Sequence, residues 1–371
     1  MNQIQKWHNE SSYIQPLSPA CKMCANGSKM VLLITGLCPS NCYYCPLSFK
    51  KSKKDVIYAN EWKLKNESDT EKIIKEAHYI NAEGAGITGG DPLTVYNRTK
   101  KYIQLLKDTF GEKFHIHLYT SGLQKAEHIP DIISAGLDEI RFHPEPKHWD
   151  KMHKSPIKKP ILESVKTGID VAIEIPAIPK KETQIHNLIE WADQKQIKYI
   201  NLNELEFSEK NQQALTKLGY HVKSDISAAA VGSQKTALKV IETISKLDLN
   251  IGVHYCSVSF KDGVQLKNRI KRRAKNIKKE FEVITEDGTL LKGAIYNKNK
   301  TLPEIKKILM EQFEIPEKYL IIDKEKNRIE IGLWILEKIA FDLKQNRFEC
   351  YMVEEYPTAD RLEVEKIPLP L

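Results

Sequence analysis

Residues 37–46 constrain this chain more than any other stretch of the sequence. They read Leu-Cys-Pro-Ser-Asn-Cys-Tyr-Tyr-Cys-Pro, so Cys38, Cys42 and Cys45 follow a C-x3-C-x2-C spacing. The apolar run at residues 30–35 leads into this loop and is predicted to be a strand. Three thiolates on one loop can bind three irons of a [4Fe–4S] cluster and leave the fourth iron without a protein ligand. A structural zinc site is the alternative, and it would need a fourth ligand.

The composition of the chain indicates its domain size and the cellular compartment in which we expect it. The chain has 371 residues, of which 41% are hydrophobic, enough for one large domain or one domain with a small appendage. No apolar run is long enough to cross a bilayer, and residues 1–13 lack the apolar core of a signal peptide. Five of the seven cysteines lie within residues 21–45, which is typical of metal binding rather than of a secreted disulfide framework. We therefore expect a cytoplasmic protein.

The middle of the chain alternates between apolar strand-like runs and helical patterns. Six strands are predicted, each followed by a helix or by a loop that leads to one, and they lie at residues 30–35, 84–88, 115–120, 139–143, 171–175 and 199–203. A seventh strand is expected at residues 250–255. Such an alternation favours parallel βα units that form a full barrel, a partial barrel or an open sheet. Ligands of these folds bind at the carboxyl ends of the strands.

Polar residues follow several of the predicted strands at that end. They are Gly89, Gly90 and Asp91 after the second strand, Ser121 after the third, Arg141 and His143 on the fourth, Glu174 on the fifth, and Asn201 and Asn203 on the sixth. Glycines let a backbone approach a ligand closely, an arginine can pair with a carboxylate, and a histidine can transfer a proton. A plain turn or a structural role is the alternative for each of them.

The cysteine loop, with Tyr44 before the third cysteine, resembles the signature of the radical S-adenosylmethionine (SAM) superfamily. The resemblance implies an α/β fold with a partial (β/α)6 barrel over about residues 30–205. It also implies that Cys38, Cys42 and Cys45 bind a [4Fe–4S] cluster whose open iron holds the amine and carboxylate of SAM. One electron from the cluster would then split SAM into methionine and a 5′-deoxyadenosyl radical, and these cysteines would be the catalytic residues.

The same resemblance implies the residues that bind SAM. Tyr44 would pack on the adenine, and Gly89, Gly90 and Asp91 would hold the amine, although the family usually has Glu where this chain has Asp91. The remaining residues expected near SAM are Ser121, Arg141 and Glu174. An electron donor such as ferredoxin or flavodoxin is implied as a partner.

Two short sequence motifs resemble, more specifically, those of uncharacterised archaeal-type proteins related to pyruvate formate-lyase activating enzyme. They are Cys-Pro-Leu-Ser at residues 45–48 and Asn-Leu-Asn-Glu-Leu-Glu at residues 201–206. The motifs do not name the molecule that loses a hydrogen atom, which we expect to be a macromolecule, RNA before protein. The alternatives are an activase that acts on a partner glycyl-radical protein, and a non-catalytic iron–sulfur or zinc scaffold that binds nucleic acid.

A second group of metal-binding residue types lies outside the main loop. Cys21 and Cys24 form a C-x2-C pair, and Cys256 follows the expected seventh strand, with His254 near the end of that strand. These four residues predict either a second iron–sulfur cluster or a zinc site, and unligated thiols are the alternative. Cys350, in a predicted strand near the end of the chain, is expected to be a core residue.

The sequence predicts four regions: an N-terminal lead-in with the C-x2-C pair at residues 1–29, a core barrel with its extension at 30–260, a basic helix or linker at 261–280, and a small α+β domain at 281–371. Residues 261–279 hold nine Lys or Arg against one acid, in a chain whose net charge is +8. This segment predicts either phosphate binding around residues 269–273 or a solvated helix face that packs Leu266 and Ile270 inward. Residues 357–371 are expected to be a loosely held terminus.

Overall fold

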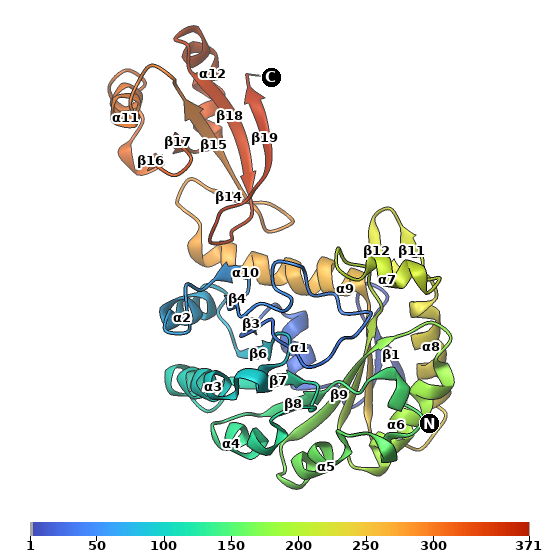
Figure 1. Cartoon of the computed structure of the whole chain (residues 1–371). Helices are drawn as coiled ribbons and strands as arrows, with labels where there is room; N and C mark the ends of the chain where they lie inside the picture. The colour runs from blue at the N-terminus through green and yellow to red at the C-terminus, as the bar shows by residue number, and fades with distance from the viewer. Residues whose placement is uncertain (1–2, 371) are drawn as a thin grey trace. The chain divides into compact units, whose positions relative to one another are not determined.

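The computed structural model describes residues 3–370 and divides the chain into two compact units. The first unit comprises Met1–His78 and Ala82–Leu266, and the second comprises Tyr79–Asn81 and Lys267–Leu371. The predicted linker at 261–280 is therefore split, because its first six residues belong with the first unit and the rest with the second. Figure 1 draws both units, with the second in orange and red.

Seven parallel strands form the centre of the first unit. In spatial order they are β13 (Gly252–Cys256), β10 (Tyr199–Glu204), β9 (Asp170–Ala177), β8 (Glu139–Phe142), β7 (His115–Thr120), β6 (Gly84–Thr88) and β3 (Lys29–Leu33). All six strands predicted from the repeated βα pattern are present, and β13 confirms the seventh. Because all seven run in one direction, their carboxyl ends lie at the same edge of the sheet.

Helices cover the outer face of this curved sheet, as Figure 1 shows. They are α2 (Thr70–Tyr79), α3 (Tyr96–Phe110), α4 (Ile129–Ser134), α5 (Lys158–Lys166), α6 (Glu182–Gln194) and α8 (Ser233–Ile244). In α6 the buried residues Ile185, Leu188, Ile189 and Ala192 recur every three or four positions, which gives the helix one apolar face to pack on the strands. The partial barrel of βα units is confirmed.

The N-terminal lead-in is more ordered than the sequence indicated. It forms β1 (Ile4–Lys6), β2 (Ser12–Ile14) and α1 (Pro19–Ala25). β2 pairs antiparallel with β13 and extends that edge of the sheet, while α1 contacts β3, β6 and β7 (Figure 1). At the opposite edge, β4 (Tyr58–Ala59) and β5 (Trp62–Lys63) follow β3.

Two short segments complete the first unit near the carboxyl ends of the strands. Between β10 and α8, the chain forms α7 (Gln212–Lys217) and a hairpin of β11 (Val222–Ser224) and β12 (Ser227–Ala230). After β13, it forms α9 (Val258–Phe260) and a π-helical turn at Lys261–Leu266.

The second unit begins with the basic helix α10 (Lys267–Ile277) and continues as an antiparallel sheet with two helices. Its elements are β14 (Val283–Ile284), β15 (Leu290–Tyr296), α11 (Leu302–Glu311), β16 (Leu320–Asp323), β17 (Arg328–Ile331), α12 (Leu333–Gln345), β18 (Glu349–Glu355) and β19 (Glu363–Leu369). The strand order β16-β17-β15-β18 with this connectivity is the split β-α-β arrangement. The expected loose terminus is wrong, because β19 pairs along β18 as an edge strand and so tolerates Pro368.

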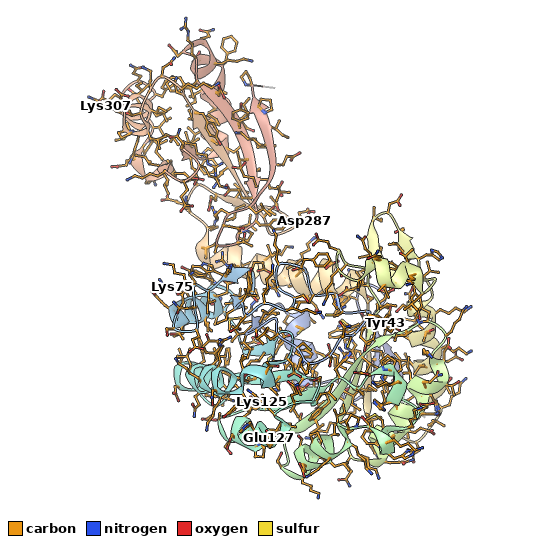
Figure 2. All side chains as sticks on the ribbon, in the orientation of Figure 1. Tyr43, Lys75, Lys125, Glu127, Asp287 and Lys307 are labelled. Atoms are coloured by element: carbon orange, nitrogen blue, oxygen red, sulfur yellow. The ribbon has the colours of Figure 1, made fainter. Side chains whose placement is uncertain are left out.

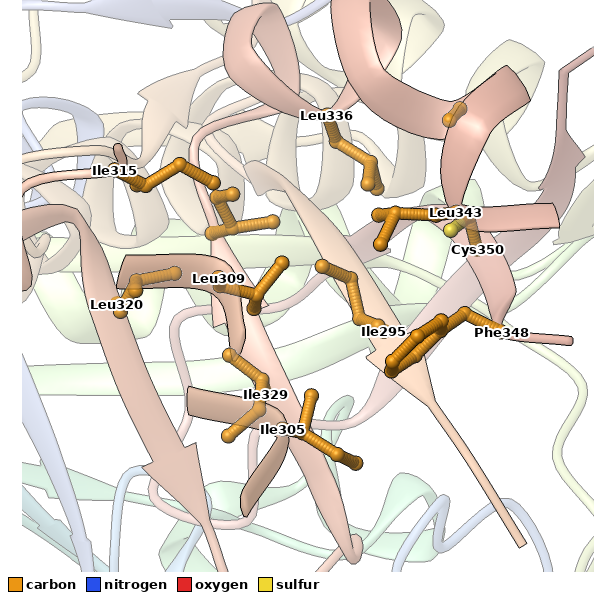
Figure 3. Packing of buried hydrophobic residues seen from close by; sticks show 12 residues of the cluster. Ile295, Ile305, Leu309, Ile315, Leu320, Ile329, Leu336, Leu343, Phe348 and Cys350 are labelled. Carbon is orange, nitrogen blue, oxygen red and sulfur yellow. The ribbon is translucent and has the colours of Figure 1, made fainter. Parts of the chain in front are cut away.

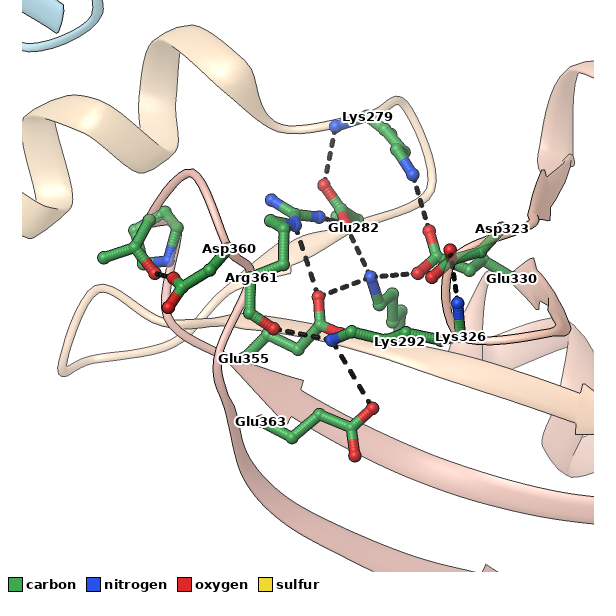
Figure 4. A network of polar contacts seen from close by, with 12 residues as sticks. Lys279, Glu282, Lys292, Asp323, Lys326, Glu330, Glu355, Asp360, Arg361 and Glu363 are labelled. Carbon is green, nitrogen blue, oxygen red and sulfur yellow. Dashed lines mark hydrogen bonds and ion pairs between the residues drawn. The ribbon is translucent and has the colours of Figure 1, made fainter. Parts of the chain in front are cut away.

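One face of this sheet packs on α11 and α12 to form an apolar core, which Figure 3 shows. Ile295, Ile329 and Leu336 are fully buried there, and Cys350 is a core residue as predicted. The other face carries buried charges in mutual contact (Figure 4). The Lys292 ammonium lies 2.7 Å from Glu355, and together they neutralise charges that would be costly to bury alone.

Candidate functional site

The loop with the three cysteines follows β3 at the carboxyl edge of the sheet. Cys38 is exposed, Cys42 and Cys45 are partly buried, and all seven cysteines of the chain are free thiols. Neighbouring protein atoms displace water from the Cys38 and Cys42 sulfurs, and this loss of hydration raises the pKa of both thiols. The three thiols are thus available as ligands on a loop that reaches the barrel mouth.

The glycine pair after β6 fastens the beginning of that loop. The amide of Gly90 donates to the carbonyl of Thr35 at 2.7 Å, and the amide of Asp91 donates to the carbonyl of Leu37 at 2.7 Å. A Cβ atom on Gly90 would lie only 2.2 Å from the Leu37 oxygen. Because Gly90 has no side chain, the backbone after β6 can contact the backbone that leads into Cys38.

Asp91 is turned into the protein, with 1% of its surface exposed. Its carboxylate accepts hydrogen bonds from the Thr120 hydroxyl at 2.9 Å and from the amide of Leu93 at 3.1 Å. It also accepts from the amide of Ser121 at 3.0 Å and from the Ser121 hydroxyl. Burial raises its pKa. Asp91 and Ser121 therefore join the ends of β6 and β7, and their contact with SAM stays a prediction.

Tyr44 is held from the other side of the mouth by the residue that follows β8. The Nδ1–H of His143 donates to the carbonyl of Glu174 at 2.7 Å, since a carbonyl can only accept. The second nitrogen, Nε2, therefore accepts from the Tyr44 hydroxyl at 2.9 Å. Burial lowers the pKa of His143 and favours this neutral form. Tyr44 itself is only 6% exposed.

Arg141 lies inside the barrel and pairs with carboxylates of this chain. Its Nε lies 2.6 Å from Glu139, and its terminal nitrogen lies 2.7 Å from Glu174. Glu174 also accepts from the side-chain amide of Asn203 at 2.8 Å. Glu139 is completely buried and was not predicted, although it stands two residues before Arg141 on the same face of β8.

The second group of candidate ligands is only partly assembled. Cys21, on α1, accepts a hydrogen bond from Arg141 at 3.5 Å, while Cys256 accepts one from Gln265 at 3.6 Å. The Nδ1–H of His254 donates to Asn201 at 2.6 Å, and its buried Nε2 has no partner among residues 3–370.

Nowhere in the described residues do three or more Cys, His, Asp or Glu side chains converge to hold one metal ion. The zinc site that the sequence predicts at Cys21, Cys24, His254 and Cys256 stays a prediction, as does a second iron–sulfur cluster there. A cubane cluster binds each thiolate to a different iron, and its ligands need not meet at one point.

The basic helix α10 uses two of its arginines within its own unit. Arg272 donates to the carbonyls of Ile80 and Asn81 at 2.7 and 2.5 Å, and Arg273 is 5% exposed and donates to the carbonyl of Pro357. Arginine commonly satisfies such unpaired carbonyls near the end of a helix. Two of the guanidinium groups that we expected to bind phosphate, within residues 269–273, therefore already donate to carbonyls of the protein.

Comparisons with known proteins agree with the cysteine loop. The model of the radical SAM superfamily matches residues 32–191, and a domain of unknown function (DUF8061) matches residues 288–369. A protein of Methanocaldococcus jannaschii is 44% identical over 100% of this chain and 96% of its own length. That protein is provisionally named a glycyl-radical enzyme activating enzyme.

Solved structures give weaker matches. SuiB of Streptococcus suis matches 64% of this chain at 12% identity, with a TM-score of 0.44. The radical SAM methyltransferase TsrM of Kitasatospora setae matches 68% at 8% identity, with a TM-score of 0.36. The match spans about half of each of these two solved chains, 52% in both cases. None of the helices in residues 3–370 has the length and hydropathy needed to span a membrane.

Proposed function

This chain belongs to the radical SAM superfamily, and from that premise we propose that Cys38, Cys42 and Cys45 hold a [4Fe–4S] cluster that cleaves SAM. When bound, the reduced cluster would supply one electron to SAM, releasing methionine and a 5′-deoxyadenosyl radical that abstracts hydrogen from a substrate. The observation that carries this proposal is the set of three free thiols on one loop at the carboxyl edge of parallel strands.

The surrounding residues fit that role in two ways. Gly89 and Gly90 bring the β6 backbone against the cysteine loop, which supports our proposal that main-chain carbonyls there would hold the SAM amine. The hydrogen bond with His143 keeps the Tyr44 ring in one position beside the cysteines, where we propose that it packs on the adenine. Arg141 and Glu174, which we expected near SAM, pair with each other, and Arg141 also pairs with Glu139.

Anaerobic reconstitution followed by reduction tests this proposal. The unchanged protein should release 5′-deoxyadenosine from SAM, with dithionite or with a ferredoxin or flavodoxin as donor. Cys42→Ala should lose both iron and product, whereas Cys350→Ala, in the apolar core of the second unit, should keep both. Intact SAM in the presence of a full complement of iron would instead identify a non-catalytic scaffold.

The iron content also tests the second group of cysteines. One cluster corresponds to about four irons per chain, and a second cluster at Cys21, Cys24 and Cys256 would raise this to about eight. Cys21→Ala should then lower the iron content by half. An unchanged content of about four would show that these thiols carry no cluster.

A second candidate function is the activation of a glycyl-radical protein. The provisional name of the M. jannaschii relative, which matches this chain over its full length, favours it. Mixing the reduced enzyme and SAM with a glycyl-radical protein encoded in the same genome should then produce a glycyl radical visible by electron paramagnetic resonance. Product formation from SAM without that signal would count against this partner.

A further inference from the structure

The loops at the two ends of the parallel strands differ in charge. The segments that follow the seven strands contain 16 lysines and 12 acidic residues, whereas the loops that precede the strands contain four of each. The segments that follow are residues 34–69, 89–95, 121–128, 143–157, 178–181, 205–232 and 257–266. Because the strands are parallel, the first group surrounds the barrel mouth and the second lies at the opposite end. The excess of positive charge is therefore concentrated where the cysteine loop lies.

Six of these lysines have exposed side chains. They are Lys50, Lys53 and Lys54 after β3, Lys151 and Lys154 after β8, and Lys180 after β9. Within residues 3–370, none of the six side chains makes a hydrogen bond or an ion pair, in contrast to Lys147, which pairs with Glu145 at 2.5 Å. We call these six residues the rim lysines.

Contacts within the first unit bring the loops of the rim together. The hydrogen bond of 2.9 Å between Tyr44 and His143 joins the β3 loop to the end of β8. The side chain of Asn211, after β10, donates to the carbonyl of Tyr44 at 3.0 Å, and Lys210 donates to the Ser52 hydroxyl at 2.7 Å. These contacts join the β3 loop to the segments after β8 and β10, and all six rim lysines lie on loops at the carboxyl edge of the parallel strands. Figure 2 labels Tyr43, which belongs to the cysteine loop at this edge.

An exposed aromatic ring stands beside the first three rim lysines. Phe49 is 55% exposed, and among residues 3–266 it is the only phenylalanine or tryptophan that is exposed. A phenylalanine left in water next to Lys50 offers a surface on which an unpaired base can stack, while the lysines neutralise the phosphates. An acidic protein would use the charges but would have less use for the ring.

We propose that the rim lysines and Phe49 dock a single-stranded segment of nucleic acid across the mouth of the barrel. The inference deepens the proposed function, on which it rests, because it assigns the class of substrate that would meet the radical. It also moves the expected RNA contact from the basic helix, where Arg272 and Arg273 are engaged, to the loops around the cysteines.

Fluorescence anisotropy with labelled 20-mers of RNA and of DNA tests the docking surface on the anaerobically prepared protein. Binding should weaken linearly on a log–log plot against salt. A triple variant combines Lys50→Gln, Lys54→Gln and Lys151→Gln. In this variant the slope of log affinity against log salt concentration should fall by about two, and the affinity itself by about tenfold. The control combines Lys113→Gln, Lys166→Gln and Lys195→Gln, near the amino ends of the strands, and should bind like the unchanged protein. The two probes show whether RNA or DNA is preferred, and tight binding of either supports the inference.

Phe49→Leu separates nucleic acid from an acidic protein. It should weaken oligonucleotide binding roughly five- to 150-fold and leave binding of poly-glutamate unchanged. Two results would overturn the inference. One is that poly-glutamate binds as tightly as RNA and DNA, and the other is that oligonucleotides bind equally to the rim variant and the control variant. SAM cleavage is measured separately on the unchanged protein. Cleavage without oligonucleotide binding removes only the docking surface, whereas failure of cleavage removes the proposed function itself.

Discussion

At the scale of single residues, the ring of His143 determines where Tyr44 lies. Its Nδ1–H is committed to the carbonyl of Glu174, so Nε2 must accept from the tyrosine hydroxyl. His143→Phe would remove the nitrogen that accepts from that buried hydroxyl, a loss of about 1–3 kcal/mol. We expect SAM to bind the reconstituted variant more weakly by a corresponding factor, measured by equilibrium binding under anaerobic conditions.

The control for this prediction is Tyr43→Phe, which changes the neighbouring tyrosine of the same loop. Its effect on SAM affinity should be small, since Tyr43 does not contact His143 in the described part of the chain. If His143→Phe bound SAM as tightly as the unchanged protein, then Tyr44 would not position the cofactor.

The cysteine thiols predict how cluster assembly depends on pH. Burial raises the pKa of Cys38 and Cys42, so both are largely protonated at neutral pH. Iron binds the thiolate and releases the proton, so assembly should become faster and more complete from about pH 7 to about pH 8.5. The absorbance of the cluster during anaerobic reconstitution measures this, and a rate that falls over this range would contradict it.

At the scale of elements, the contact between β6 and the cysteine loop depends on Gly90. Gly90→Ala would place a methyl group 2.2 Å from the Leu37 carbonyl, and a backbone oxygen cannot move aside cheaply. We expect lower thermal stability and reduced iron loading. Gly168→Ala is the control, because its φ of +85° carries backbone strain while no atom lies within 4 Å of the new methyl group. Equal iron loading in the two variants would contradict the role of the contact.

Arg141 links β8 to β9 through the partly buried Glu174, and it also pairs with the buried Glu139 of its own strand. Arg141→Leu would leave Glu139 and Glu174 without their cation, which we expect to cost about 3–5 kcal/mol of unfolding free energy. Lys147→Ala removes an exposed pair with Glu145 and should cost less than about 1 kcal/mol. Denaturant unfolding of the two variants measures the difference, and similar values for both would show that the buried pair adds little.

The elements also show which features of the fold are visible in a sequence. Strands of the parallel sheet are buried on both faces and read as apolar runs, so six were predicted from their pattern and the seventh was expected. β1 and β2 have three residues each, too few for a periodicity to appear. In the edge strand β19, five of the seven residues are exposed and three are charged, so its sequence was mistaken for a loose terminus.

The candidate site was predictable in its positions but not in its contacts. Asp91, Ser121 and Glu174 could be placed at the carboxyl ends of strands because the order of βα units determines that edge. Their partners could not, since the bond of His143 to Tyr44 and the pairing of Arg141 with Glu139 depend on how loops and side chains meet in three dimensions. Glu139 had a recognisable signal in the sequence. It is an acidic residue two positions before Arg141 on a buried strand, so the two side chains lie on the same face and can pair.

At the scale of the whole molecule, the chain combines a barrel unit that carries the cysteines with a split β-α-β unit that has its own core. Leu336→Ala, in that second core, should cost about 2–5 kcal/mol in the unfolding of this unit, because the cavity it leaves lies among fully buried residues. Calorimetry measures this loss. A transition unchanged from that of the original protein would show that the second unit does not depend on this packing.

The central claim is that three cysteines leave one iron of a cluster open for SAM, and electron paramagnetic resonance of the reduced protein tests it most directly. The account predicts that adding SAM changes the spectrum of the cluster, and that Cys42→Ala shows no cluster signal at all. A spectrum that stays the same when SAM is added, or an intact cluster signal in Cys42→Ala, would contradict it.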